Sequence, residues 1–443
     1  AGTRVNPQGL VETVELLGGE LVTNGNFATD SDWTNQSGTN WSISGGKASV
    51  TNSASIRYFQ QSGVLTTPTV GKSFSVTWTI SDLTQGGIGI NIGGYLTTTI
   101  QTSIGTYQEI ITPTNASTNT IVYIQSNTNT IGSIENISVK EVTRNDLARV
   151  DYDGTASSLL VEPQRTNLIT YSSDFSQWNN ARTTDTSNQA TSPDGNNNAT
   201  YLEQNSGQTT AGSVYVLSTI SAGTNTLSVF AKKKEKDFIV LYDTNGDRTY
   251  FDLNNGSVGT TQAGVTANIK NYGNGWYRCS ATFTASSSGS QNIAFYLADN
   301  DSAAPIADSG GIYIWGASLE QGSYPTSIIP TNGSTVTRVQ DQYSKTGISS
   351  KINSEEGVLF VEGSILSDDG TTQIISLLES ASSRVSLTFS STLNRIQFYV
   401  AINGYTNTVT INAEGFTKTQ VNKIALRYGA NNYALFINGV KEG

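Results

Sequence analysis

Four aromatic side chains could bind a sugar, because they lie on or beside stretches whose alternation is typical of strands. A pyranose ring packs against an exposed aromatic face, while neighbouring amides and carboxylates take its hydroxyl groups. The candidates are Trp78, Tyr95, Tyr242 and Tyr250. At each position the alternative is that the ring packs in a core or a turn, and the sequence leaves both interpretations open.

Residues for catalysis are sparse. The chain has no histidine, which excludes Ser-His-Asp and Cys-His triads and histidine-containing zinc sites. A single cysteine, Cys279, excludes an intrachain disulfide and a thiolate zinc cluster. Two carboxylates roughly 5–10 Å apart could still hydrolyse a glycosidic bond, but the acids are scattered and no pair stands out. We therefore expect no enzyme activity and no required cofactor.

One group of acids, Asp243, Asp247 and Asp252, falls in a segment rich in Asn and Gly. Such spacing is typical of a hairpin turn, and it also supplies oxygen ligands of the kind that calcium prefers. The spacing does not fit an EF-hand, since no glutamate stands at the closing position. The turn is the favoured interpretation, with calcium as the alternative.

Composition and charge narrow the class of protein. The 443 residues carry a net charge of −10 with only 14% charged residues, which argues against a nucleic-acid partner. The basic run at residues 232–236 is interpreted as the solvated end of a strand or hairpin. No apolar stretch approaches the ~20 residues of a membrane helix, so we expect no membrane insertion.

The polar residues and the periodicity predict an all-β chain. Two stretches open alike, at residues 21–27 and 168–175, and close alike, at residues 134–140 and 314–320. Between these ends apolar residues alternate with Ser and Thr, as in an antiparallel sandwich with one buried and one solvated face. We predict two copies of one β-sandwich (jelly-roll) type, at residues 18–143 and 165–325.

The segment from residue 351 onward differs from both copies. Alternating apolar residues predict strands at residues 358–362, 385–389 and 396–402, and a hairpin joins residues 425–428 to 434–437. Asn438-Gly439 predicts a type I′ turn, after which a strand should follow, but the sequence ends at Gly443. We expect a third sandwich at 351–443 that is incomplete, and linkers at 1–17, 144–164 and 326–350. With no methionine at all, the chain is expected to be part of a longer protein.

Several spaced motifs together resemble the phage tail-fibre and head-spike-fibre family. They are residues 159–168, 171–175 with Trp178, 251–259, 275–278, 324–331 and 337–339. The resemblance covers about residues 150–340. In that family an opening segment like Thr3-Arg4-Val5 usually runs directly into one like Val150-Asp151-Tyr152, so the resemblance implies that the first sandwich is an insertion.

Two weaker resemblances concern the flanking modules. Residues 24–27 resemble the opening of carbohydrate-binding jelly rolls of glycoside hydrolases, and residues 436–439 are similar to concanavalin-like or laminin-G-like lectin sandwiches. Jelly-roll carbohydrate modules often hold a structural calcium near their first strand. By that resemblance Glu20 or Glu320 is a candidate calcium ligand.

Together the resemblances imply a virion structural protein, displayed on the particle surface and extracellular after host lysis. The expected partners are a host-surface polysaccharide or receptor, other virion proteins and two further copies of the chain in a trimer. Two alternatives stay open: a connector of the virion that binds no ligand, and a glycan depolymerase.

Overall fold

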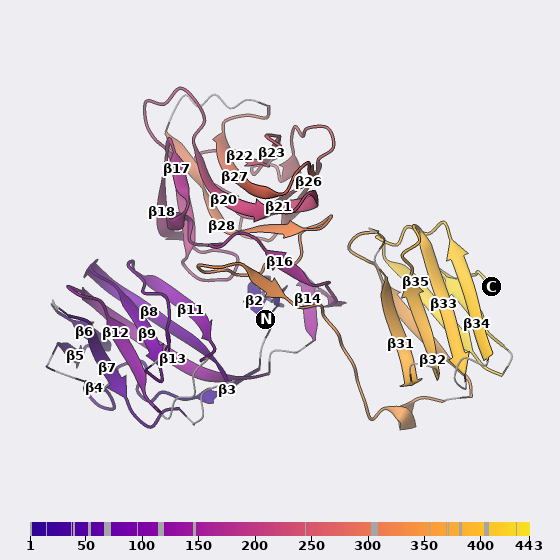
Figure 1. Cartoon of the computed structure of the whole chain (residues 1–443), viewed down its shortest axis with the longest axis horizontal. Helices are drawn as coiled ribbons and strands as arrows, with labels where there is room; N and C mark the ends of the chain where they lie inside the picture. The colour runs from indigo at the N-terminus through magenta and orange to yellow at the C-terminus, as the bar shows by residue number, and fades with distance from the viewer. Residues whose placement is uncertain are drawn as a thin grey trace. The chain divides into compact units, whose positions relative to one another are not determined.

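The computed structural model describes most of the chain and is all-β, as predicted (Figure 1). The described residues are 2–14, 16–36, 38, 40–51, 55–65, 72–94, 96–113, 119–144, 148–243, 245–302, 309–353, 355–368, 370, 372–380, 383–402, 407–430 and 432–443. Two compact units divide the chain at residue 341, and each is described by itself. None of the helices found among these residues has the length and apolarity needed to cross a membrane.

The first sandwich of unit 1 packs a five-stranded sheet against a six-stranded one. The five-stranded sheet has the order β10 (Leu96–Thr97), β9 (Ile88–Ile92), β12 (Val122–Ser126), β7 (Arg57–Gln61) and β4 (Thr34–Asn35). The other has the order β11 (Gly105–Ile111), β8 (Ser73–Gln85), β13 (Ile131–Arg144), β6 (Lys47–Val50) and β5 (Trp41–Ser44), with β3 (Leu16–Glu20) also pairing β13. The alternation in β8 buries Phe74, Val76, Trp78 and Ile80 between the sheets.

Gly25 explains why the first sandwich opens with Asn-Gly-Asn-Phe. The Ile137 N–H donates to the Gly25 carbonyl at 2.9 Å, so the opening turn lies directly against β13. A Cβ at Gly25 would lie 2.2 Å from the Ile137 carbonyl oxygen, which is main chain and cannot rotate away. Glycine is therefore needed here for close backbone approach rather than for a turn conformation.

We expect Gly25→Ala to destabilise the first sandwich by about 1–3 kcal/mol, because the added methyl group must displace backbone. Gly19→Ala is the matched control, since a Cβ at Gly19 meets nothing within 4 Å. Urea unfolding followed by tryptophan fluorescence measures both variants. Equal midpoints for the two would contradict this explanation.

The second sandwich has two six-stranded sheets. One, named here the tyrosine sheet, has the order β17 (Asn179–Ala181), β20 (Ser213–Ile220), β27 (Gly289–Ala298), β22 (Phe238–Tyr242), β23 (Arg248–Asp252) and β24 (Ser257–Val258). The opposite sheet has the order β18 (Thr183–Ala190), β19 (Ala199–Gln204), β28 (Gly310–Gln321), β21 (Gly223–Lys233), β26 (Trp276–Ala285) and β25 (Thr266–Asn271). Cys279 lies fully buried in the core between them.

The stretches expected as linkers beside the second sandwich contain strands. These strands take part in three two-stranded sheets: β1 (Thr3–Val5) with β2 (Val11–Thr13), β14 (Arg149–Asp153) with β15 (Ala156–Leu160), and β29 (Val336–Arg338) with β16 (Arg165–Asn167), the first residues of the predicted second sandwich. The Val5 N–H donates to Asp151 Oδ1 at 2.7 Å, so β1 and β14 lie together although the whole first sandwich separates them in sequence. Such adjacency is what an inserted domain requires, because its two ends must meet on the host domain.

Unit 2 holds two four-stranded sheets around a smaller core. One has the order β30 (Gly357–Gly363), β35 (Asn422–Tyr428), β36 (Ala434–Ile437) and β37 (Val440–Lys441). The other has the order β31 (Gln373–Ser380), β32 (Ser383–Phe389), β33 (Arg395–Ile402) and β34 (Asn407–Glu414). Asn438 and Gly439 have φ values of 51° and 87° and join β36 to β37, which confirms the predicted turn. The strand β37 that follows it is only two residues long.

Candidate functional site

The four rings predicted to bind sugar differ in their burial and in their place in the fold. Trp78 is 0% exposed and packs against Tyr107, with ring centroids 5.6 Å apart, so core packing, the alternative considered above, describes it. A ring without exposed surface cannot stack on a sugar. Tyr95 lies outside the described residues. Tyr242 and Tyr250 both belong to the tyrosine sheet, on the face that points away from the core.

Three half-buried tyrosines share that outer face and form a surface named here the tyrosine face: Tyr215, Tyr242 and Tyr296. Tyr215 and Tyr242 pair with Ala294 from its two sides, and Tyr296 follows two residues further along β27. The small side chain of Ala294 is 0% exposed, so the larger neighbouring side chains close over it. Tyr242 and Tyr296 have ring centroids 5.6 Å apart at 57°, a tilted contact that steadies both.

Polar side chains border the tyrosine face. The Arg248 guanidinium lies 5.5 Å from the centroid of the Tyr296 ring, and Arg248 pairs with Tyr242 across β22 and β23. Asn292 is exposed on β27 and pairs with Leu217, which is 65% exposed on β20. An aromatic platform with donors and acceptors at its rim is the arrangement that a sugar ring requires.

Tyr250 is buried and does not form part of the tyrosine face. Its side chain is 5% exposed and packs with Val240 and Ala298. The Tyr250 N–H donates to the Thr260 carbonyl, and the Gly259 N–H donates back to the Tyr250 carbonyl, both at 2.9 Å. Core-like packing therefore again describes the residue.

Asp243 and Asp252, two of the three clustered acids, stabilise turns by accepting hydrogen bonds from main-chain N–H groups. Asp243 is 3% exposed, and its Oδ1 accepts the N–H of Asn245 at 2.8 Å and of Asp247 at 3.1 Å. Burial raises the pKa of the Asp243 carboxyl, while these hydrogen bonds oppose the rise. Asp252 accepts the N–H groups of Asn254 and Asn255 in the same way. No cluster of three or more His, Cys, Asp or Glu suited to a metal occurs in the described part of the chain.

The two candidate calcium ligands accept hydrogen bonds from protein groups. Glu20 accepts from the Ser138 hydroxyl at 2.6 Å and the Val139 N–H at 2.8 Å, which holds β3 on β13. Glu320 is 0% exposed and accepts from the Ser318 hydroxyl at 3.0 Å and from Thr326. Burial raises the pKa of the Glu320 carboxyl, and the Arg278 charge opposes it. Calcium at either residue stays a prediction.

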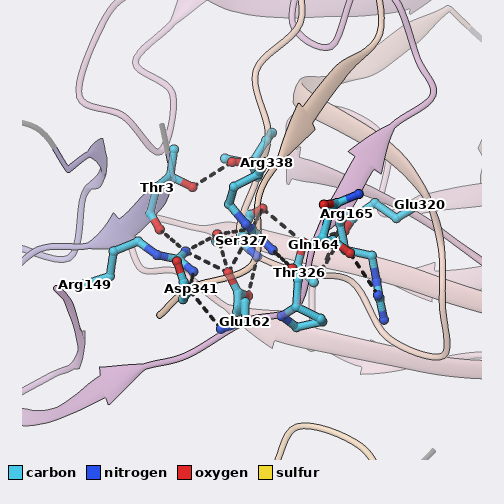
Figure 2. A network of polar contacts seen from close by, with 12 residues as sticks. Thr3, Arg149, Glu162, Gln164, Arg165, Glu320, Thr326, Ser327, Arg338 and Asp341 are labelled. Carbon is cyan, nitrogen blue, oxygen red and sulfur yellow. Dashed lines mark hydrogen bonds and ion pairs between the residues drawn. The ribbon is translucent and has the colours of Figure 1, made fainter. Parts of the chain in front are cut away.

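A buried ion cluster at the base of the second sandwich was not anticipated from the sequence (Figure 2). Glu162 Oε2 lies 2.7 Å from Arg149 Nη1 and 2.9 Å from Arg338 Nη1, and all three side chains are at most 3% exposed. Asp341 pairs with the other side of the Arg149 guanidinium. The Ser327 N–H donates to Glu162 Oε1 at 2.7 Å. Two cations and two anions therefore balance one another out of water.

The ion cluster joins segments that lie far apart in the chain. Arg149 Nη1 also donates to the Thr3 carbonyl at 2.9 Å, and Arg338 Nη2 donates to the Pro163 carbonyl at 2.9 Å. Burial opposes the ionisation of Glu162, but the charges of Arg338 and Arg149 outweigh it and hold the pKa of Glu162 below its ordinary value. The cluster is therefore interpreted as the fastening between the N-terminal segment, the β14–β15 hairpin and the returning strand β29.

Comparison with known proteins gives one distant structural likeness. No protein-family model and no curated protein matches the chain, so the resemblance to phage fibre proteins stays a prediction. Among solved structures the chain is similar to the N-terminal CBM22-1–CBM22-2 tandem domain of Xyn10C from Paenibacillus barcinonensis. The match has 12% identity and a TM-score of 0.24, and covers 70% of this chain and 99% of that one. This distant likeness carries no argument about a ligand. The β-sandwich architecture follows from the paired sheets and the buried cores between them.

Proposed function

We propose that this chain is a glycan-binding attachment protein whose tyrosine face stacks on sugar rings. The observation that carries the proposal is the set of three half-buried tyrosines around Ala294 on one face of a rigid sheet. A half-buried tyrosine offers a partly apolar ring and a polar hydroxyl group, which together suit contact with a sugar ring. Ordered β-strands hold them, so little entropy is lost on binding.

The proposed setting is the surface of a phage particle, with the chain as a fibre or spike that contacts host polysaccharide. The support is the ordered series of motifs between residues 159 and 339. In such a setting weak binding at one site suffices, because repeated copies on a particle multiply avidity. A trimer and contacts with other virion proteins belong to the same proposal.

The experiment is a glycan screen with the full chain, immobilising bacterial surface polysaccharides and neutral and acidic oligosaccharides. We expect binding to a restricted group of glycans, with dissociation constants in the micromolar to millimolar range of a single shallow site. The matched control is the full chain with Tyr242→Ala and Tyr296→Ala together. Binding to no glycan, or equal binding by the double variant, would contradict the proposal. Loss of polymer viscosity during the incubation would instead favour the depolymerase alternative.

A further inference from the structure

A recess lies on the opposite sheet of the second sandwich, away from the tyrosine face. It has a volume of about 360 Å³. Its walls are the N-terminal segment at Leu10, the turn between β18 and β19 at Pro193, the end of β21 at Lys232, and the turn between β25 and β26 at Tyr272 and Asn274. This volume is near the lower end of the ~300–1,000 Å³ usual for small-molecule sites, which suits a single sugar ring rather than a chain of them.

The turn that forms one wall of the recess is tightly specified. Gly273, Asn274 and Gly275 have successive φ values of 78°, 50° and 78°. The Tyr272 N–H donates to the Trp276 carbonyl at 2.9 Å, and the Trp276 N–H donates to the Gly273 carbonyl at 2.8 Å. Asn and Gly are the residues that accept this left-handed backbone at least cost.

Further contacts hold the other walls in place before any ligand arrives. The Tyr272 ring meets Phe230 edge-on, with centroids 4.8 Å apart at 83°. Trp276, at 2% exposure, donates its Nε1–H to the Thr191 carbonyl at 2.9 Å. The Val11 N–H donates to the Pro193 carbonyl at 2.9 Å, which fixes the N-terminal segment over the recess. The site is therefore formed in the free protein.

The charge of the recess is positive, although the chain as a whole carries −10. In the run at residues 232–236, Lys233 pairs with Asp237 at 2.7 Å, Lys234 with Glu235 at 3.3 Å, and Lys236 with Asp299. Within the part of the chain that the structure describes, Lys232 is the lysine of this run for which no carboxylate lies within ion-pair distance. No Asp or Glu lines the recess.

The position of Lys232 suits an anion that sits beside an aromatic ring. A Cβ at Gly275 would lie 3.4 Å from Lys232 Cε, so the aliphatic stem runs along the turn. The Lys270 ammonium lies 5.6 Å from the centroid of the Tyr272 ring and adds a second positive charge next to the recess. An ammonium without a carboxylate partner beside a half-buried tyrosine is complementary to a ring that carries a carboxylate.

We propose that this recess binds one acidic sugar residue, a uronic acid or a comparable carboxylate-bearing monosaccharide. Its carboxylate pairs with Lys232, and its ring packs against Tyr272. The inference rests on the proposed glycan binding for its ligand class, but it concerns a separate site on the other sheet. The two can therefore fail independently.

The test uses the full chain and saturation-transfer NMR with titration by glucuronate, with glucose as the neutral counterpart and acetate and inorganic phosphate as anions without a sugar ring. We expect glucuronate to bind about tenfold more tightly than glucose, the usual scale of a charge-assisted hydrogen bond. Lys232→Met keeps the aliphatic stem and should abolish that difference. Lys234→Met is the matched control, because the Lys234 ammonium lies 3.6 Å from the centroid of the Tyr201 ring and does not line the recess.

Any of these results would overturn the inference: equal affinity for glucuronate and glucose, unchanged glucuronate binding by a folded Lys232→Met variant, or acetate and phosphate binding as tightly as glucuronate. Absence of glucuronate binding at millimolar concentration would overturn it as well. Thermal unfolding of each variant shows whether it is folded. Binding of the screened glycan to the tyrosine face should be the same in Lys232→Met and wild type. A wild-type chain that binds glucuronate but no other glycan would refute the proposed function and leave this inference standing.

Discussion

Replacing Glu162 by glutamine should lower the free energy of unfolding of unit 1 by about 3–5 kcal/mol, the cost of leaving a buried ion without its partner. The substitution keeps the shape of the side chain and removes one of the two negative charges that face Arg149 and Arg338. Urea unfolding followed by tryptophan fluorescence reports on unit 1 alone, because all six tryptophans precede residue 342. Hydrogen exchange then shows whether β14, β15 and β29 are the strands that loosen.

Two control variants distinguish the loss of the buried ion cluster from the general effect of removing a charge. Asp237→Asn removes one partner of the exposed Lys233–Asp237 pair and should cost about 0–1 kcal/mol. Replacing Glu162 and Arg338 together by methionine should cost less than the two single replacements added, since neither buried charge is then left alone. A Glu162→Gln variant as stable as wild type would show that the cluster does not fasten these segments.

The same cluster predicts a pH dependence. Because the folded pKa of Glu162 lies below its unfolded value of about 4.3, its contribution is fully present above that pH and is lost as the pH falls through the folded pKa. The stability difference between wild type and Glu162→Gln should therefore be constant from neutral pH to about pH 5. This stability difference should become smaller below about pH 5. A difference that became larger there would contradict a stabilising role for the ionised Glu162.

Replacing any one tyrosine of the tyrosine face by alanine should weaken glycan binding about tenfold, which corresponds to roughly 1.4 kcal/mol for a central aromatic contact. Tyr296 should have the largest effect, since it contacts both Tyr242 and the Arg248 guanidinium. Isothermal titration calorimetry with the glycan found in the screen measures each variant.

Tyr296→Phe and Tyr201→Ala are the controls for the tyrosine face. The phenylalanine variant keeps the ring and should retain most of the affinity if stacking is the mode of binding. Tyr201 is similarly half-buried but belongs to the opposite sheet, so its loss should leave binding unchanged. A Tyr201→Ala variant that loses as much affinity as Tyr296→Ala would show that neither effect is local.

Much of the fold follows from local sequence, because a period of two marks strands wherever one face is buried. The alternation from Phe74 to Ile80 and the Asn438-Gly439 turn both predict the structure found. The strands β1, β14 and β29 escape this reasoning. These strands are short, and some of their hydrogen bonds join residues far apart in the sequence. Val5, for example, donates its N–H to Asp151, 146 residues away.

The candidate site shows a similar division. Tyr242 is among the sugar-binding candidates named from the sequence, whereas Tyr215 and Tyr296 are not. Each of these two directly follows a core residue, Val214 or Phe295, so its side chain points to the opposite face of the sheet. Both would have been found by selecting, in each strand of the second sandwich, the alternate residues that point away from the core. Trp78 was a candidate because a large aromatic residue at an alternating position of a strand can face either the core or the solvent. Which of the two applies is known only once the facing sheet has been placed.

No pattern in the sequence could have shown the ion cluster. Arg149 and Asp341 are 192 residues apart, and each is a charged residue of ordinary appearance in its own segment. Their meeting depends on how the chain returns to the base of the second sandwich after completing it. Long-range pairing of this kind becomes visible only once the tertiary structure is in hand.

The most direct test of the account is a crystal structure of the full chain with the glycan identified by the screen. The account predicts a sugar ring against Tyr296, bordered by Tyr215 and Tyr242, with Arg248 or Asn292 in hydrogen-bond contact with its hydroxyl groups. A glycan bound on the first sandwich or on unit 2, with the tyrosine face empty, would contradict it.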